Sequence, residues 1–176
     1  NILSLKASDS EVTLMADIEL TESEGEGCFA INGKDIMEAV KGLPENPLTF
    51  SMDSEEDTIV KIDYFSGMFT LPVNNAMEFP TLPAMDNANL VTFNITEGLL
   101  QENIARTVFA SADDELRPVM NGIFFDLTAE HLAVVASDGH TLVRNKVLSV
   151  KATDETKTGS FILPKKPAHI LKNVLS

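Results

Sequence analysis

The sequence predicts an α+β fold, in which helices gather on one face of antiparallel sheets. A strand-like segment followed by an amphipathic helical pattern occurs three times, as CFAINGKDIMEAVKGLP (28–44), TFNITEGLLQENIARTV (92–108) and SFILPKKPAHILKNVLS (160–176). The segments between these repeats alternate apolar and polar residues and are bounded by turn residues, as antiparallel strands with one buried face are. Each unit is therefore expected to be a strand, a helix and then several antiparallel strands.

The second residue of each repeat is a phenylalanine, and an aliphatic residue follows two positions later, which is the spacing of one strand face. These pairs are Phe29 and Ile31, Phe93 and Ile95, and Phe161 and Leu163. A residue suited to starting a helix follows, because Asn and Thr can cap a free backbone N–H and Pro fits the first helical turn. These residues are Asn32, Thr96 and Pro164. Apolar residues then recur three or four positions apart, so each helix should have one face that packs on a sheet.

Six strands are expected between and after the first two helices. They are PLTFSMD (47–53), TIVKIDYF (58–65), GMFTLPV (67–73), NGIFFDL (121–127), HLAVVAS (131–137) and TLVRNKVLSV (141–150). Gly67 and the pair Asp138–Gly139 supply turn chemistry between neighbouring strands. The sequence therefore favours antiparallel meanders that follow each helix.

A longer repeat indicates where the domains begin and end. NILSLKASDSEVTLMADIE, from Asn1, resembles NGIFFDLTAEHLAVVASDGH, from Asn121, at an offset of 120 residues. If that offset holds, Asn1 lies inside a domain, and the equivalent of residues 91–120 would precede it. We therefore expect two partial domains, residues 1–88 and 89–176. They would join near EFPTLPAMDNANLV (78–91), where prolines and small polar residues favour a linker.

The composition allows a buried core but is strongly acidic. Hydrophobic residues make up 44% of the 176 residues, and the formal net charge is −14. The acids cluster in expected loops, such as TESEGEG (21–27) and SADDE (111–115), where solvated turns are the simplest interpretation. The single cysteine, Cys28, excludes a disulfide framework and a cysteine-rich zinc site, and it fits a reducing, cytoplasmic setting. No phosphate-binding loop or dinucleotide motif is present, so no cofactor is expected.

Basic residues recur on the expected helices despite the acidic composition. They are Lys34, Lys41, Arg106, Lys165, Lys166 and Lys172. An ordinary solvated lysine explains any one of them, but recurrence in three copies favours a functional basic face.

Only one cluster resembles a catalytic site. Asp138 lies two residues before His140 and could orient its imidazole, as in a hydrolase. No serine or cysteine nucleophile motif accompanies the pair, and Asp138–Gly139 is also good hairpin chemistry. Two alternative functions of the chain therefore stay open, a hydrolase centred on Asp138 and His140 and a repeat scaffold that does not bind DNA. No catalytic or metal-binding residue is assigned.

Taken together, the repeats and several longer motifs resemble the bacterial sliding clamp family, the β subunit of DNA polymerase III. The motifs are RPVMNGIFFDL, VVASDGHTLV, FILPKKPAHILKNVL, EFPTLP and VKGLPE, and the resemblance covers the whole chain in register. It implies a DNA-clamp fold with three similar domains, two subunits forming a ring around duplex DNA, and no catalytic activity. The implied partners are double-stranded DNA, bound without sequence preference, the polymerase catalytic subunit, the clamp loader and other replication and repair proteins. No membrane association is implied.

The resemblance also implies three groups of site residues. The helix cations above, joined by Arg117 in DDELRPV, would contact DNA phosphates. A pocket for partner peptides would use Met120, Ser137, Gly139, His140, Thr141 and Leu142, although Thr141 stands where the family usually has arginine. A dimer edge would lie at the strand DYFSGMF (63–69), with Tyr64, Phe65, Met68 and Phe69. For Phe65 and Phe69, an ordinary core position is the alternative.

Overall fold

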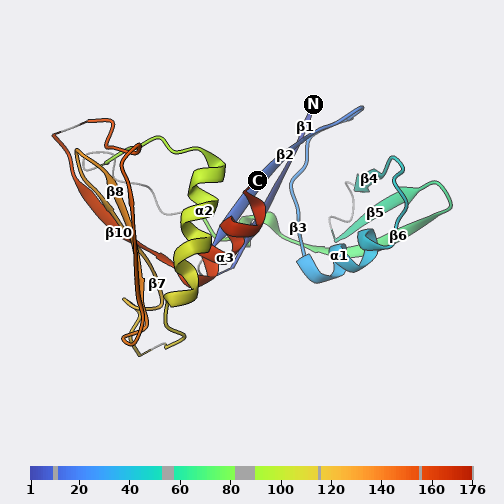
Figure 1. The fold of residues 1–176 in the computed structure, drawn as a ribbon. Helices are drawn as coiled ribbons and strands as arrows, with labels where there is room; N and C mark the ends of the chain where they lie inside the picture. Colours follow the sequence, from blue (N-terminus) through green and yellow to red (C-terminus); the bar gives the residue numbers. More distant parts are fainter. Residues whose placement is uncertain (10–11, 53–57, 82–89, 115, 155, 176) are drawn as a thin grey trace. The chain divides into compact units, whose positions relative to one another are not determined.

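The computed structural model describes residues 1–9, 12–52, 58–81, 90–114, 116–154 and 156–175. Its chain forms two compact units, residues 1–83 and 84–176, and each is described by itself (Figure 1). The predicted boundary after residue 88 lies outside the described residues and stays a prediction. Among the helices that the structure describes, none is both long and apolar enough to cross a lipid bilayer.

The first unit contains a two-stranded hairpin and a separate four-stranded antiparallel sheet. The hairpin joins β1 (Ile2–Ser8) and β2 (Thr13–Glu19). The sheet has the order β3-β6-β5-β4, with strands Ala30–Ile31 (β3), Thr49–Met52 (β4), Ile59–Tyr64 (β5) and Gly67–Asn74 (β6). Helix α1 (Gly33–Lys41) follows β3, and the 3₁₀ helix η1 (Ala76–Glu78) follows β6.

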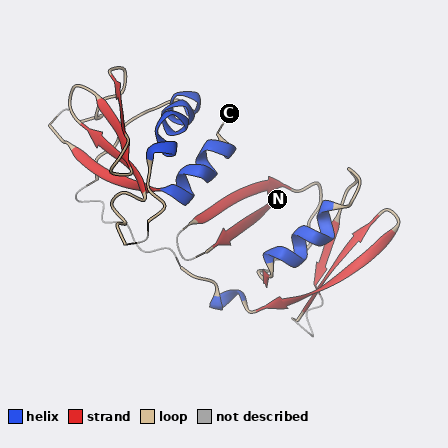
Figure 2. Ribbon diagram, turned by 60° about the horizontal axis from the view of Figure 1, so that its bottom comes forward, coloured by secondary structure: helices blue, strands red, loops and turns tan. Residues whose placement is uncertain are grey.

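The second unit is one four-stranded antiparallel sheet with two helices on it. The sheet has the order β10-β7-β8-β9, with strands Gly122–Leu127 (β7), Leu132–Ser137 (β8), Leu142–Val147 (β9) and Gly159–Pro164 (β10). Helix α2 (Glu97–Thr107) runs into the 3₁₀ helix η3 (Val108–Ala110), and α3 (Lys165–Val174) follows β10. The two helices lie side by side against one face of this sheet, so the predicted α+β layering is confirmed (Figure 2).

The core of the second unit lies between these helices and the sheet. Ile104 of α2 and Ala168 of α3 are fully buried against Ile123, Phe125 and Val134 of the sheet. At about 25 cal/mol per Å² of apolar surface removed from water, the buried Ile, Phe and Val side chains contribute about 1.5–3 kcal/mol each. The predicted apolar helix spacing is therefore the feature that builds this layer.

The first unit has a smaller core. Val60, Ile62 and Val73 of its sheet are buried, whereas the β1–β2 hairpin exposes Leu5 and Leu14, each 48% accessible. Cross-strand pairing places three apolar pairs on one face of the hairpin, Leu3 with Ile18, Leu5 with Ala16, and Ala7 with Leu14. The hairpin is therefore amphipathic even though its apolar face is largely solvent-exposed.

The β1–β2 and β7–β8 hairpins have matching closing pairs. These pairs are Ser8 with Thr13 and Leu127 with Leu132, and they differ by 119 residues in both strands. The 120-residue offset read from the sequence therefore stays a prediction.

The helix starts fit the predictions unequally. The Asn32 side chain accepts a hydrogen bond from the Lys34 N–H at 2.9 Å, as a cap should. Thr96 is the N-cap residue of α2, as the sequence predicted, but its side chain makes no capping hydrogen bond. Pro164 stands directly before α3, and the Lys165 N–H is satisfied by the Asn121 carbonyl at 3.2 Å. The strand predicted at Phe93 is reduced to a single bridge with Ala152.

Candidate functional site

The turn between β8 and β9 is organised by two side chains that hydrogen-bond to the backbone. Asp138 Oδ1 accepts hydrogen bonds from the N–H groups of His140, at 2.8 Å, and Thr141, at 2.6 Å. The Ser137 hydroxyl donates to the Thr141 carbonyl at 2.8 Å and accepts from the Gly139 N–H at 3.2 Å. The bonds from Thr141 and then His140 lower the pKa of Asp138. The sequence Ser-Asp-Gly thus fixes the shape of the predicted pocket rim.

Gly139 is required here by its backbone. Its φ is +92°, a conformation that side chains other than hydrogen rarely allow. A Cβ at this position would also lie 3.7 Å from Arg117 Nη1. The Arg117 guanidinium therefore stands directly beside the turn, although the sequence assigned Arg117 to the DNA contacts and Gly139 to the pocket.

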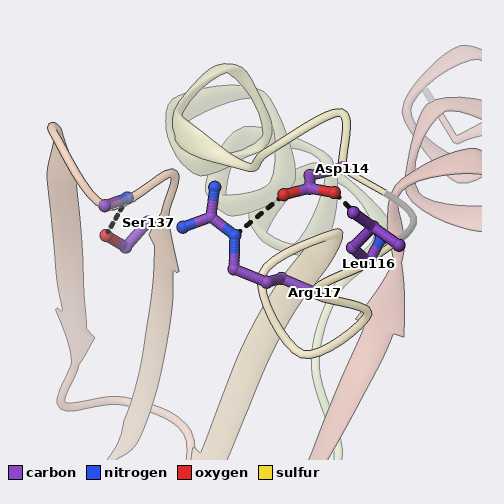
Figure 3. A network of polar contacts seen from close by, with 5 residues as sticks. Asp114, Leu116, Arg117 and Ser137 are labelled. Carbon is purple, nitrogen blue, oxygen red and sulfur yellow. Dashed lines mark hydrogen bonds and ion pairs between the residues drawn. The ribbon is translucent and has the colours of Figure 1, made fainter.

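Arg117 is held in place by Asp114. Its Nε donates to Asp114 Oδ2 at 2.8 Å, and the other carboxylate oxygen accepts from the Leu116 N–H at 2.9 Å (Figure 3). These bonds, led by the one from Arg117, lower the pKa of Asp114. Figure 3 shows the guanidinium extending from this carboxylate toward the turn that contains Ser137. Arg117 thus joins the α2–β7 connection to the pocket rim.

The apolar members of the predicted pocket differ in exposure. Met120 is half-buried, and its carbonyl accepts from the Ala112 N–H at 2.9 Å. Leu142 is 67% exposed, so it is not a core residue of this chain. Leu116 and Val119, which the sequence interpretation missed, are also exposed, at 91% and 67%. The sequence feature that could have identified them is the presence of two large apolar residues within two positions of Pro118, in a connection rich in acidic residues.

The predicted DNA contacts occupy different environments. Lys34 and Lys41 are exposed on α1 of the first unit. On α2, Arg106 is exposed and forms an ion pair with Glu102 one turn earlier. Lys165 is only 20% exposed at its side chain, and Nζ lies 2.6 Å from Asp113 Oδ1. On α3, Lys166 is exposed, and Lys172 is half-buried in the last turn.

A cavity of about 550 Å³ lies between α2 and the edge strand β9. Arg106 and Glu102 line it from the helix, and Arg144 and Lys146 line it from the strand. The sequence interpretation did not single out these two strand cations. The sequence feature that could have identified them is the pair of basic residues at alternate positions in TLVRNKV, which lie on the same face of a strand.

The predicted dimer edge needs a correction. The segment 63–69 is not one edge strand, because Tyr64 ends β5, Gly67 begins β6, and the two strands pair with each other. Phe65 lies in the two-residue turn and is 91% exposed, so it is not a core residue here, whereas Phe69 stacks on Tyr64 with ring centroids 5.2 Å apart. Within the described residues, β3 pairs only with the C-terminal end of β6, at Val73 and Asn74. The outer side of residues 67–72 therefore has no strand partner there.

The geometry gives the hydrolase alternative no support. The Asp138 carboxylate oxygen is engaged by backbone N–H groups, and the Ser137 hydroxyl donates to a backbone carbonyl. Within the described ranges, no group of three or more His, Cys, Asp or Glu residues could hold a metal ion.

Two consecutive family models match this chain. The N-terminal domain of the DNA polymerase III beta subunit matches residues 1–83, and its central domain matches residues 94–176. The chain belongs to the DNA polymerase III beta subunit family. This agrees with the resemblance found in the sequence and with the helix-on-sheet layering of the second unit.

Named relatives and solved structures agree with this assignment. The beta sliding clamp of Halalkalibacterium halodurans is 28% identical over 98% of this chain and 46% of the relative, and that of Escherichia coli K12 is 27% identical over 93% and 43%. The beta subunit structure from Pseudomonas aeruginosa superposes with a TM-score of 0.88 at 25% identity, covering 99% of this chain and 46% of that one. The Helicobacter pylori beta clamp gives 0.84 at 25% identity, covering 99% and 47%. The chain thus spans about half the length of the relatives it matches.

Proposed function

We propose that this chain is part of a DNA sliding clamp, the processivity factor of a bacterial DNA polymerase III. The two consecutive family matches carry this proposal, because they cover both units in the order of the family's first and second domains. In the intact protein, two subunits would form a ring around duplex DNA and tether the polymerase to it. The chain would have no catalytic site of its own and would act in the cytoplasm.

The DNA contact is proposed for the exposed helix cations. Lys34, Lys41, Lys166 and Arg106 are exposed residues, and Lys172 is a half-buried lysine in the last turn of α3. Contacts of this kind bind phosphates without reading bases, which suits a protein that slides. The acidic loops elsewhere on the chain would discourage DNA from binding outside the ring.

The test is to neutralise these five cations together in the full-length subunit. If all five contact phosphates in both subunits of the ring, about ten contacts are lost. The slope of log affinity against log salt should then decrease by about 9, since each contact contributes about 0.9. Retention on nicked circular DNA after loading should also fall. A variant with wild-type salt dependence and retention would show that these residues are not the DNA contacts.

The peptide site is proposed at the β8–β9 turn and the α2–β7 connection. Leu142, Leu116 and Val119 supply exposed apolar surface, Met120 supplies a deformable side chain, and Arg117 with Ser137 supplies polar groups at the rim. The polymerase catalytic subunit, the clamp loader and other replication and repair proteins are the proposed partners. Assembly of the homodimer is proposed to use the open side of β6 near Met68, because an unpaired strand edge invites pairing.

A further inference from the structure

The α2–β7 connection is defined here as residues 111–114 and 116–121. Its two ends, residues 111–113 and 120–121, lie next to each other, are called the neck, and are held together by Lys165. The Lys165 Nζ donates to the Ser111 carbonyl at 3.2 Å and lies 2.6 Å from Asp113 Oδ1. The Lys165 N–H donates to the Asn121 carbonyl at 3.2 Å, on the other side of the neck. One residue at the start of α3 therefore holds both ends of the connection.

The same neck carries the residues of the proposed peptide site. The Ala112 N–H donates to the Met120 carbonyl at 2.9 Å, so the two ends of the connection also bond to each other. Arg117, between those ends, is fixed by Asp114 and reaches the Gly139 turn. The two adjacent aspartates thus serve different cations, since Asp113 binds α3 through Lys165 and Asp114 orients Arg117.

Lys165 is poorly placed to serve as a phosphate contact. Its side chain is 20% exposed, and two acceptors already engage its ammonium group. Two of its three N–H donors are thus taken, and the one to Asp113 is a charge-assisted hydrogen bond, which is stronger than a neutral one. Its neighbour Lys166 is exposed in the same turn of α3. The two lysines therefore have different environments although the sequence reads them as a pair.

We propose that Lys165 is a positioning residue for the peptide site, acting through the α2–β7 connection, and not a DNA contact. The proposal rests on the proposed function for the peptide site itself. Loss of the ammonium group would leave the Ser111 carbonyl and the Asp113 carboxylate without this partner and would loosen the neck. Met120 and Arg117 would then be held less firmly where a peptide needs them.

The first test measures the neck directly by amide hydrogen exchange in the 176-residue chain. Lys165→Met and Asp113→Asn should both speed exchange of the Ala112 amide about fivefold, the effect of losing one modest ion pair. Lys165→Arg should restore slow exchange because it keeps a cationic donor, and Lys166→Met should leave exchange as in the wild type. The Asp113 side chain is 85% exposed, so Asp113→Asn should fold even if Lys165→Met does not.

The second test uses the full-length subunit with two probes, duplex DNA and a short peptide from the C-terminus of the polymerase catalytic subunit. Lys165→Met and Asp113→Asn should weaken peptide binding together, about threefold to tenfold, with rescue by Lys165→Arg. Asp113→Asn decides between the roles, because removing an acid should not weaken DNA binding. If Lys165 were a DNA contact, Lys165→Met would lower DNA affinity as Lys166→Met does, and Asp113→Asn would leave peptide binding and exchange unchanged.

A loss of DNA affinity in Lys165→Met, together with unchanged peptide binding and exchange in Asp113→Asn, would overturn the proposal. If the wild-type subunit bound neither probe, the proposed function would fail, and hydrogen exchange would still decide whether Lys165 holds the neck.

Discussion

Leu142→Ala should separate peptide binding from folding, because Leu142 is 67% exposed at the start of β9. Truncating a fully buried leucine costs about 2–5 kcal/mol of unfolding free energy. Because Leu142 is already 67% exposed, we expect Leu142→Ala to cost about one third of that range, roughly 0.7–1.7 kcal/mol. The backbone pairing of Leu142 with Ser137 should survive, since alanine keeps both backbone groups.

Peptide binding should respond more strongly. An apolar side chain that a bound peptide covers acts as an anchor, and its truncation costs about 1–3 kcal/mol. Since about 1.4 kcal/mol corresponds to a tenfold change in the dissociation constant, affinity should fall about 5-fold to 150-fold. The assay is calorimetric titration of a polymerase C-terminal peptide into the full-length subunit, alongside urea unfolding of wild type and variant.

Leu132→Ala is the matched control on the neighbouring strand. Leu132 is fully buried, so its truncation should cost about 2–5 kcal/mol in unfolding free energy. Any effect of that variant on the peptide should follow its loss of folded protein. If Leu142→Ala folded as wild type and bound the peptide with unchanged affinity, Leu142 would not be an anchor. An unfolding cost as large as that of Leu132→Ala would refute the exposure on which the reasoning depends.

Three further predictions concern the turn, its acids and the helix layer. Gly139→Ala should destabilise the β8–β9 turn by about 1–3 kcal/mol, the cost of holding a side chain at a strained φ, and should weaken the peptide; an unchanged urea midpoint would contradict this. Because hydrogen bonds lower the folded-state pKa of Asp138, the turn should be fully stabilised above about pH 5 and should lose that support as pH falls below about 4. NMR titration of the Asp138 carboxyl checks it, and a midpoint at or above the value for a free aspartate would exclude the effect. Gln101→Leu removes donation from Nε2 to the Lys172 and Leu175 carbonyls, so amides in the last turn of α3 should exchange faster, corresponding to about 1–2 kcal/mol. Exchange as slow as in the wild type would show that this amide does not hold the helix end.

The sequence by itself determined the elements and their order. Apolar residues at helical spacing, such as Ile104, fixed which helix face is buried, and the Ser137-Asp138-Gly139 run fixed a tight turn. These features are local: a helix face and a turn depend on residues within a few positions of one another. The motif resemblance added the family, which the comparisons confirm.

The tertiary structure alone decided what each side chain meets. Lys165 and Lys166 are identical in sequence terms, yet one closes the neck of the α2–β7 connection and the other is exposed. The sequence predicted strands on both sides of Gly67, but only the strand pairing showed that the open edge in this region belongs to β6. Arg117 lies 22 residues before Gly139 in the sequence and beside it in space. Such contacts depend on how distant segments pack, and because a side chain's charge and periodicity are the same whichever partner it finds, the pattern of residues cannot specify them.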